Sequence, residues 1–309
     1  MAYTTIDDPT VYFDTKLWTG NSSSDSGTQD ITGLNFQPDF MWNKTKDVAE
    51  NYILTDVLRG TNSFLRSNTT ALAYNPANCY QIPLTNGFTA QGDEGGEFNY
   101  TNFTYATWNW KANGAGATNE AGSINTIKTS ASTTSGFSII TYTGNGSSGA
   151  TIGHGLGVAP KVVIVKLTSG GGYDWGVYHA SLGNTKNMRL NLTDAVATST
   201  AFWNDTTPTS TLVSLGDNAT TNSSGTYVAY CFAEVKGFSK FGSYLGNGST
   251  DGAFIYTGFK PNWILIKRAS AGGDQWQLSD SKRGVNGAIK TLYTDSEEAE
   301  TSSDSIDHL

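Results

Sequence analysis

The sequence predicts an all-β protein made of tandem antiparallel β-sandwich repeats of the jelly-roll or lectin-like kind. Charged residues form only 15% of the 309-residue chain, and glycine occurs 35 times, whereas about 25% charged residues is usual for globular domains. Short apolar runs alternate with turns rich in Gly, Ser, Thr and Asn, which is typical of strands joined by tight connections. The hydrophobic share of 37% and the aromatic share of 12% can fill cores, so the chain is expected to fold.

An internal repeat organises the chain. An aromatic residue precedes a Gly-Asn turn, and a proline then opens an apolar run that ends in lysine. The three copies occupy residues 18–44, 142–166 and 244–267. A glycine follows each lysine after 16 or 17 positions. Matched landmarks at matched spacing indicate one structural unit used repeatedly, and a proline suits the start of a strand because it lacks a ladder N–H.

A strand with alternating aromatic residues closes the first two repeats. Residues 104–110 match residues 226–232, and in both repeats 67 positions separate the proline of the repeat from the tyrosine of this strand. The third repeat would need the same strand beyond Leu309. Because an unpaired edge strand invites aggregation, we expect this strand to come from missing C-terminal residues or from a neighbouring subunit.

Five segments follow from these landmarks. Each complete repeat has the length of a β-sandwich domain, about 100 residues. The run 162–165 is apolar at every position, so we place it in the middle of a sandwich. The predicted segments are an N-terminal arm (1–12), a first β-sandwich repeat (13–113), a linker rich in Gly, Ala, Ser and Thr (114–135), a second β-sandwich repeat (136–238) and an incomplete third β-sandwich repeat (239–309).

The composition argues against several classes of function. The net charge is −8, whereas nucleic-acid binding needs a basic footprint. No apolar run approaches the roughly 18 residues that span a bilayer, and residues 1–9 have neither the basic region nor the apolar core of a signal peptide. His154, His179 and His308 show no metal-ligand spacing. We therefore expect no cofactor, no metal, no nucleic-acid partner and no membrane insertion.

Two motifs invite a chemical interpretation, and both have a simpler structural one. The glycine-rich stretch 153–157 lacks the strand–loop–helix context and the Lys-Ser/Thr pair of a phosphate loop, so we interpret it as a connecting loop. His179 and Ser181 suggest a hydrolase, but such a site needs side chains that converge from distant positions and an oxyanion hole. The corresponding position carries Asp56 in the first repeat and Asp280 in the third. A residue that changes from repeat to repeat indicates a structural polar position, and we predict no catalytic residue.

Aromatic residues beside polar loops are the candidate ligand-binding residues, because their rings can stack on sugars. The candidates are Trp175, His179, Trp203 and Trp276. The alternative is that these rings pack in cores or between domains. Acidic residues are sparse and scattered, so the sequence names no carboxylate pair for glycoside hydrolysis.

The tripled Gly-Asn turn and the Pro-strand-Lys landmarks, together with residues 227–234 and 237–244, resemble repeat-containing virion proteins of tailed bacteriophages, of the fibre, tail or capsid-surface type. The resemblance covers most of residues 13–309. It implies localisation in the virion, lectin-like β-sandwich modules and a structural role, with no catalytic residues to transfer.

These observations lead to one interpretation and two alternatives. The first is a non-enzymatic fibre or surface appendage whose partners are other capsid or tail proteins and a host cell-surface polysaccharide. The alternatives are a purely architectural capsid decoration or tail connector and, last, a polysaccharide depolymerase. A homo-oligomer is expected, and a trimer is usual for fibres, although no coiled-coil heptad appears. The loops after the three lysines, 45–51, 168–174 and 268–274, differ between the copies and are where we look for function.

Overall fold

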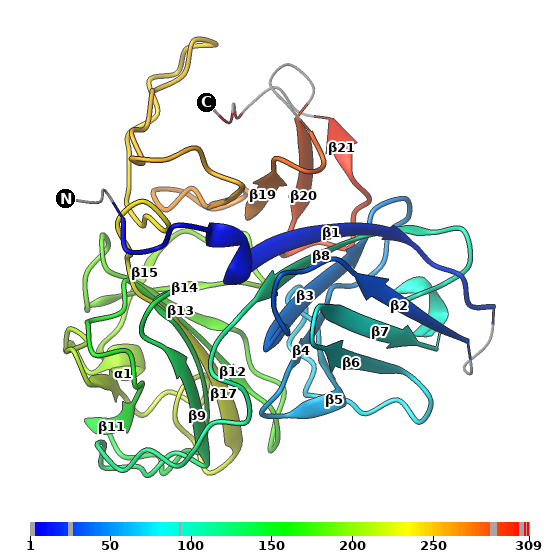
Figure 1. Cartoon of the computed structure of the whole chain (residues 1–309). Helices are drawn as coiled ribbons and strands as arrows, with labels where there is room; N and C mark the ends of the chain where they lie inside the picture. Colours follow the sequence, from blue (N-terminus) through cyan, green and yellow to red (C-terminus); the bar gives the residue numbers. More distant parts are fainter. Residues whose placement is uncertain are drawn as a thin grey trace.

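The computed structural model describes residues 4–23, 27–92, 94–284, 289–302, 306 and 308. These residues form antiparallel β-sheets with very little helix, which confirms the predicted all-β class (Figure 1). Their helical elements are one turn of α-helix, α1 (Thr200–Trp203), and the 3-10 turns η1 (Pro9–Val11) and η2 (Glu94–Gly96). The strands fall into three units, which we call the first, second and third unit in chain order.

The first unit is a sandwich of two sheets. The larger sheet has the strand order β1-β8-β3-β4-β5 and the smaller one the order β2-β7-β6. Met41, Phe64 and Phe88 belong to the core between them. The strands of the larger sheet are β1 (Phe13–Thr19), β8 (Thr104–Trp110), β3 (Phe40–Thr45), β4 (Ile53–Asp56) and β5 (Gly60–Leu65). Those of the smaller sheet are β2 (Thr28–Thr32), β7 (Gly87–Gln91) and β6 (Tyr80–Leu84).

The second unit repeats this plan. Its larger sheet has the order β15-β14-β13-β12-β17-β10-β9, and β11 pairs with β16 in a second layer. Helix α1 lies beside β16 and adds Phe202 and Trp203 to the core of the unit. The strands of the larger sheet are β15 (Ala197–Thr198), β14 (Lys186–Arg189), β13 (Gly176–His179), β12 (Val162–Leu167), β17 (Thr226–Phe232), β10 (Phe137–Thr143) and β9 (Lys128–Ser132). Those of the second layer are β11 (Ala150–Gly153) and β16 (Leu212–Leu215).

The third unit has a single sheet in the part of the chain that the structure describes. Its order is β18-β19-β20-β21. The strands are β18 (Trp263–Ile266), β19 (Gln277–Asp280), β20 (Lys290–Tyr293) and β21 (Thr301–Ser302).

Strand order and register are the same in the three units. The order β1-β8-β3-β4-β5 corresponds to β10-β17-β12-β13-β14, and β18-β19-β20 corresponds to the last three strands of each. In every unit the first residue of the lysine-ended strand pairs with the last residue of the following strand. These pairs are Phe40 with Asp56, Val162 with His179, and Trp263 with Asp280. Among its described residues, the third unit has no strand at the positions of β1 and β8.

The predicted linker 114–135 differs from a free connection. Strand β9 lies within it and pairs with β10, and Ile124 is buried and forms a bridge to β11. Gly116 shows why small residues are needed here, because a Cβ at this position would lie 2.6 Å from the carbonyl oxygen of Thr129. The small residues that led us to predict a linker therefore allow close packing against the second unit.

The N-terminal arm packs onto the body over part of its length. Ile6 is buried, and the ring of Tyr12 meets Phe238 edge-on with centroids 6.2 Å apart. The carbonyl oxygen of Tyr12 accepts a hydrogen bond from the backbone N–H of Lys111 at 2.9 Å. The arm therefore touches both the first unit and the end of the predicted second repeat.

One hydrophobic core is shared by all three units. It combines buried residues from the larger sheets of the first and second units with residues of the third sheet. Aromatic contacts cross the boundaries: Phe40 stacks on Tyr230 with ring centroids 4.3 Å apart, and Trp110 meets Trp263 edge-on at 5.5 Å. Because each aromatic side chain buries about 150–250 Å², the units stabilise one another and are not independent modules along a string.

Candidate functional site

The structure buries the tryptophans that we predicted as ligand-binding residues. Trp175 is 0% exposed, Trp203 1% and Trp276 6%. The indole Nε1 of Trp175 donates a hydrogen bond of 3.0 Å to the carbonyl of Arg66, and that of Trp276 donates one of 2.9 Å to the carbonyl of Arg189. Both indoles thus join neighbouring units. The burial contradicts the predicted sugar stacking, and packing between units explains Trp175 and Trp276.

The four predicted residues do not meet at one surface. Trp203 contacts Tyr178 inside the core of the second unit, with centroids 5.8 Å apart, whereas Trp175 belongs to the shared core. His179 ends β13 and is half-buried. Its Nδ1 accepts a hydrogen bond of 3.2 Å from the backbone N–H of Ser181. Burial lowers the pKa of His179 below its ordinary value, so the ring is neutral at pH 7.

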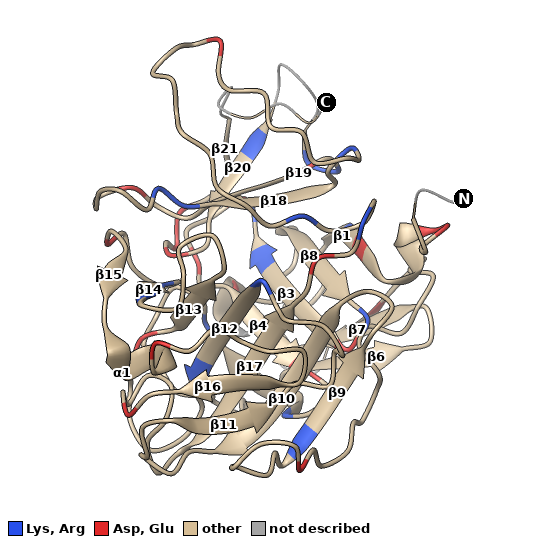
Figure 2. Cartoon of the chain, turned by 90° about the vertical axis from the view of Figure 1, so that its left-hand side faces the viewer, with Lys and Arg blue, Asp and Glu red and all other residues tan. Residues whose placement is uncertain are grey.

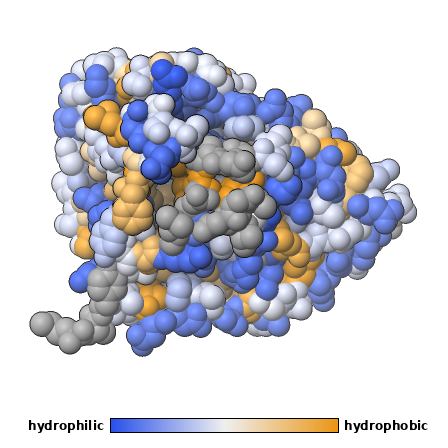
Figure 3. All heavy atoms as spheres, turned by 90° about the horizontal axis from the view of Figure 1, so that it is seen from above, coloured by the Kyte–Doolittle hydropathy of each residue, from blue (hydrophilic) through white to orange (hydrophobic). Residues whose placement is uncertain are grey.

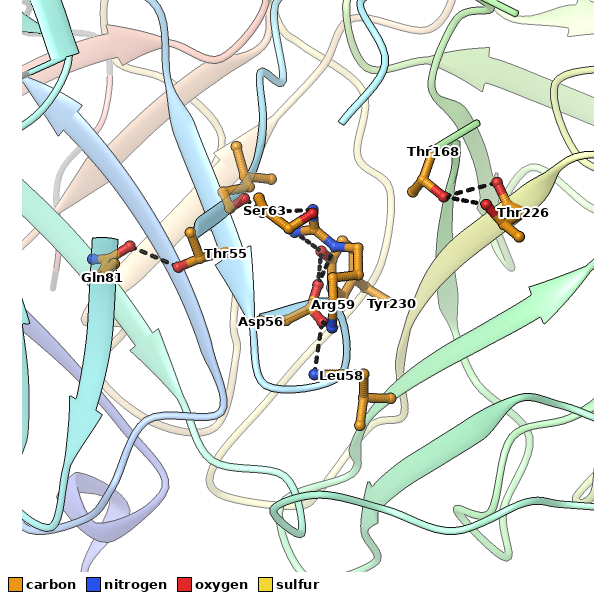
Figure 4. A network of polar contacts seen from close by, with 10 residues as sticks. Thr55, Asp56, Leu58, Arg59, Ser63, Gln81, Thr168, Thr226 and Tyr230 are labelled. Atoms are coloured by element: carbon orange, nitrogen blue, oxygen red, sulfur yellow. Dashed lines mark hydrogen bonds and ion pairs between the residues drawn. The ribbon is translucent and has the colours of Figure 1, made fainter. Parts of the chain in front are cut away.

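An aspartate at the end of β4 is the polar centre of the boundary between the first and second units (Figure 4). Asp56 Oδ1 accepts hydrogen bonds from the backbone N–H groups of Leu58 at 3.0 Å and Arg59 at 2.9 Å. Its Oδ2 accepts from Arg59 Nε at 2.6 Å and from the hydroxyl of Tyr230, in β17, at 2.8 Å. Four donors satisfy this buried carboxylate, and one of them ties the second unit to the first.

The boundary between the first and third units has the same arrangement. Asp280 Oδ2 accepts from Arg283 Nε at 2.6 Å and from the indole Nε1 of Trp108, in β8, at 2.9 Å. The sequence signal for both sites is Asp-x-x-Arg-Gly, at 56–60 and 280–284. We predicted the two aspartates as a structural position but did not predict that the nearby arginines pair with them. The aromatic donors were also missed, because they come from strands far away in the chain.

The boundary between the second and third units departs from this arrangement. His179 has the register position of the two aspartates, and residues 179–183 read His-Ala-Ser-Leu-Gly, so neither the acid nor the arginine is present. The aromatic donor of this boundary would come from a strand beside β18. Among the described residues, the third unit has no such strand.

The three strand-ending lysines anchor the loops that follow them. Lys166 Nζ donates to the carbonyls of Leu167 at 3.0 Å, Tyr173 at 2.9 Å and Thr70, in the first unit, at 3.2 Å. Burial lowers the pKa of Lys44 and of Lys166 to about 8. The other two lysines donate in the same way, Lys267 to the carbonyls of Arg268, Asp274 and Thr193, and Lys44 to those of Thr45 and Val48. The lysines therefore hold the loops to the body of the protein.

The third unit presents an uncovered strand edge. All four residues of β18 are half-exposed, whereas β3 is buried at all six positions and β12 at five of six. In the described part of the chain, no strand pairs with the outer edge of β18, which lies at the base of a protruding segment in Figure 2. An open edge of this kind is a template for pairing with another chain.

The protruding segment, residues 244–256, carries exposed apolar side chains at both of its ends. Leu245 is 91% exposed, and Phe254 and Tyr256 are each 74% exposed. The segment stands away from the body at the top of Figure 1. Figure 3 looks down on this end of the molecule and shows hydrophobic surface between hydrophilic residues. Since exposed apolar patches mark interaction surfaces, the open edge of β18 and this segment together form the candidate functional site.

Two recesses of the surface are small. One of about 220 Å³ lies beside Asp56 and is lined by Met41, Thr55 and Gln81 among others. The other, of about 170 Å³, lies between residues 234–240 and 256–258, at the base of the protruding segment. Small-molecule sites usually measure about 300–1,000 Å³. Recognition of another chain at the third unit therefore suits this surface better than capture of a small ligand.

No helix among the described residues is long and apolar enough to cross a membrane. In the same part of the chain, no three His, Cys, Asp or Glu side chains gather as metal ligands. Cys79 and Cys231 are both buried.

Residues 8–309 match the family described as Domain of unknown function (DUF7483). No curated protein and no solved structure matches the chain. The matched range includes all three units of this chain.

Proposed function

Because the chain belongs to the DUF7483 family, we propose its function from its own architecture: it is a non-enzymatic structural protein of a bacteriophage particle that joins another virion protein through its third unit. The observation that carries this proposal is a contrast between the units around the shared core. In the first and second units an inserted strand pairs with the lysine-ended strand, whereas among the described residues the third unit has no such strand. The phage particle itself comes from the resemblance of the repeated motifs. The open edge of β18 and the exposed segment 244–256 support assembly with another protein.

A capsid decoration or tail connector fits this surface better than a glycan-binding fibre. The glycan interpretation depended on exposed tryptophans, and Trp175, Trp203 and Trp276 are buried. The buried charges also have structural tasks. Asp56 and Asp280 bind arginines and aromatic donors at the boundaries between units.

Particle labelling tests this function. Particles purified through a density gradient are analysed by mass spectrometry, and antibodies against the chain are located on them by immunogold microscopy. We expect the chain at a fixed stoichiometry and at one position of the head or tail. Its absence from purified particles, with the chain found only in the soluble fraction of infected cells, would contradict the proposal. A host polysaccharide bound by the isolated chain on a glycan array would instead favour the fibre alternative.

A further inference from the structure

We propose that the third unit accepts one β-strand from another polypeptide, seated antiparallel along the outer edge of β18 and carrying the alternating aromatic pattern of β8 and β17. The partner is a protein with an extended segment in which small and aromatic residues alternate. This inference deepens the proposed function and rests on it only for the partner's place in a virion. The acceptor itself follows from the geometry of the chain.

The first two units show what occupies the position beside β18. Strand β8 lies between β1 and β3, and β17 lies between β10 and β12, each antiparallel to both neighbours. Three alternate residues of the inserted strand face the shared core, and we call the middle one its central residue. It is Trp108 opposite Trp42 in the first unit and Tyr230 opposite Ile164 in the second. Leu265 of β18 stands two residues before the strand-ending lysine, as Trp42 and Ile164 do. A strand added to the third unit would thus place its central residue opposite Leu265.

The two inserted strands also define the pattern of the donor. Alternate residues of each strand enter the shared core, and the tyrosine near the start of each faces the core of its own unit. Those in the shared core are Ala106, Trp108 and Trp110 of β8 and Val228 and Tyr230 of β17, with Phe232 packed against it, and those facing away are Tyr105 and Tyr227. The donor therefore needs a small residue followed by two aromatic residues at every second position, so that its rings cover the half-exposed β18.

The neighbouring segment is unpaired as well. Residues 237–239 repeat the Gly-Phe-Ser found at 136–138, where β10 begins at Phe137, yet residues 240–247 form no strand. In the closed units the inserted strand pairs with this element on one side and with the lysine-ended strand on the other. One added strand would therefore supply both missing partners, which explains why the edge and the exposed segment occur together.

His179 sets the chemistry of the central donor residue. At the other two boundaries the central residue of the inserted strand donates a hydrogen bond to an aspartate. At the third boundary His179 occupies the register position of that aspartate. The Nδ1 of His179 already accepts a hydrogen bond from the N–H of Ser181. In a neutral imidazole the other nitrogen then carries the proton and donates. The central residue of the added strand must therefore accept a hydrogen bond from His179. A tyrosine hydroxyl can accept one, whereas a tryptophan N–H cannot.

A second copy of this chain fits the position less well than a separate partner. The two strands of the chain that carry the pattern have their central residues Trp108 and Tyr230 almost fully buried. A copy that donated one of them would have to open one of its own closed units. A separate protein with an extended segment outside its own folded core would not have to unfold any part of itself to donate the strand. The addition of a strand at an open sheet edge is a common mode of peptide recognition.

Peptide binding to the full chain tests the acceptor. The probe is a fluorescent peptide with the sequence of residues 226–232, with serine at the position of Cys231 and flanking lysines for solubility. We expect saturable binding by anisotropy and at least about tenfold weaker binding of a scrambled peptide. The variant Leu265→Lys should lose at least about tenfold in affinity. The matched control Leu17→Lys, at an exposed leucine on the edge strand β1, should bind as the wild type does, and thermal unfolding shows that both variants are folded.

A second measurement tests the role of His179. A peptide with tryptophan in place of the central tyrosine should bind the wild-type chain about fivefold or more weakly than the tyrosine peptide, because its N–H faces another donor. In the variant His179→Asp this preference should disappear, since an aspartate accepts from both rings as Asp280 and Asp56 do. A preference that is the same in both proteins would overturn the assignment of His179.

Two outcomes would overturn the acceptor. One is the absence of binding of either peptide at millimolar concentration. The other is a chain that is oligomeric on its own, becomes monomeric in Leu265→Lys and never binds peptide, which would make a second copy the occupant. The two proposals fail separately. If the chain binds the peptide but is absent from particles, the strand acceptor is supported and the virion role is contradicted. If the chain is found on particles but binds no peptide, the virion role is supported and the strand acceptor is contradicted.

Discussion

The indole of Trp108, in the first unit, donates a hydrogen bond of 2.9 Å to the carboxylate of Asp280, in the third. The hydroxyl of Tyr230 stands in the same relation to Asp56 across the boundary between the second and first units, at 2.8 Å. Each of the two inserted strands is thus held by a hydrogen bond from its central residue to a carboxylate of another unit. The third boundary has His179 in place of the aspartate and, among the described residues, no inserted strand. Two of the three boundaries are therefore completed by an inserted strand, and the third is not.

Replacing Asp280 by asparagine should be strongly destabilising. The side chain of Arg283 is fully buried and pairs with Asp280 at 2.6 Å and with Glu300 at 3.0 Å. Breaking a buried ion pair by removing one partner costs about 3–5 kcal/mol, and because Glu300 still compensates part of the charge of Arg283, the loss should lie at the lower end of that range, about 3 kcal/mol. We expect Asp280→Asn to lower the free energy of unfolding by that amount in urea titrations.

The surface pair of Arg268 and Asp274 provides the control. Its atoms lie 2.9 Å apart, but both side chains are about half exposed, and such pairs contribute about 0–1 kcal/mol. Asp274→Asn should therefore change the free energy of unfolding little. Equal losses for the two variants would show that the buried pair has no special role at the boundary.

Removing the hydroxyl of Tyr230 should weaken the boundary between the first and second units without changing the packing. Tyr230→Phe keeps the ring that stacks on Phe40 and removes one of the four donors to Asp56. A hydrogen bond to a charged group contributes about 1.5–3 kcal/mol. We expect a loss of that size in the free energy of unfolding, and a double-mutant cycle with Asp56→Asn should show that the two losses are not additive.

The sequence allowed prediction of the parts of the fold that depend on local pattern. The lysine-ended strands, the inserted aromatic strands and their spacing all follow from alternation and turn residues. The shared core could not be predicted in the same way, because periodicity shows that a strand has a buried face but not which element covers it. Trp175 illustrates the limit: beside a polar loop it has the same sequence signature whether it faces solvent or, as observed, the carbonyl of Arg66 in another unit.

Strand β9 and the candidate site show two further limits. The small residues of β9 and its surroundings predicted a linker, because the sequence does not show how closely they approach β10. The open edge of β18 is seen in the strand order of the described residues. The chemistry of the boundary did not follow, because the aromatic donor comes from a part of the chain far from the aspartate and its arginine.

Charging the exposed segment should affect association and leave folding unchanged. Leu245 and Phe254 are 91% and 74% exposed, and substitutions at such positions usually change stability by less than about 0.5 kcal/mol. We expect the double variant Leu245→Asp, Phe254→Asp to unfold at the wild-type urea concentration. Fluorescence anisotropy should show weaker binding of the peptide with the sequence of residues 226–232 than the wild type shows. A clear loss of stability would instead mean that the segment packs against the body in solution.

The buried lysine Lys166 should make stability rise with pH in the weakly alkaline range. Burial lowers its pKa from the ordinary 10.5 to about 8 in the folded protein. Between these two values the unfolded chain binds more protons than the folded chain, so the free energy of unfolding increases with pH. At about 1.36 kcal/mol for each pKa unit, the gain of the wild type over Lys166→Met should be about 1–2 kcal/mol between pH 7.5 and pH 9.5.

Two features of the experiment isolate this effect. The measurement stays below pH 10, where buried tyrosines act in the opposite direction, because burial raises the pKa of Tyr142 and of Tyr230 and their unfolded forms lose protons first. Lys128→Met, at an exposed lysine of β9, removes the same charge without removing a buried one, and its difference from the wild type should not change with pH. Parallel pH profiles for the wild type and Lys166→Met would show that Lys166 is not desolvated, and its hydrogen bonds to three carbonyls would then have to form in contact with water.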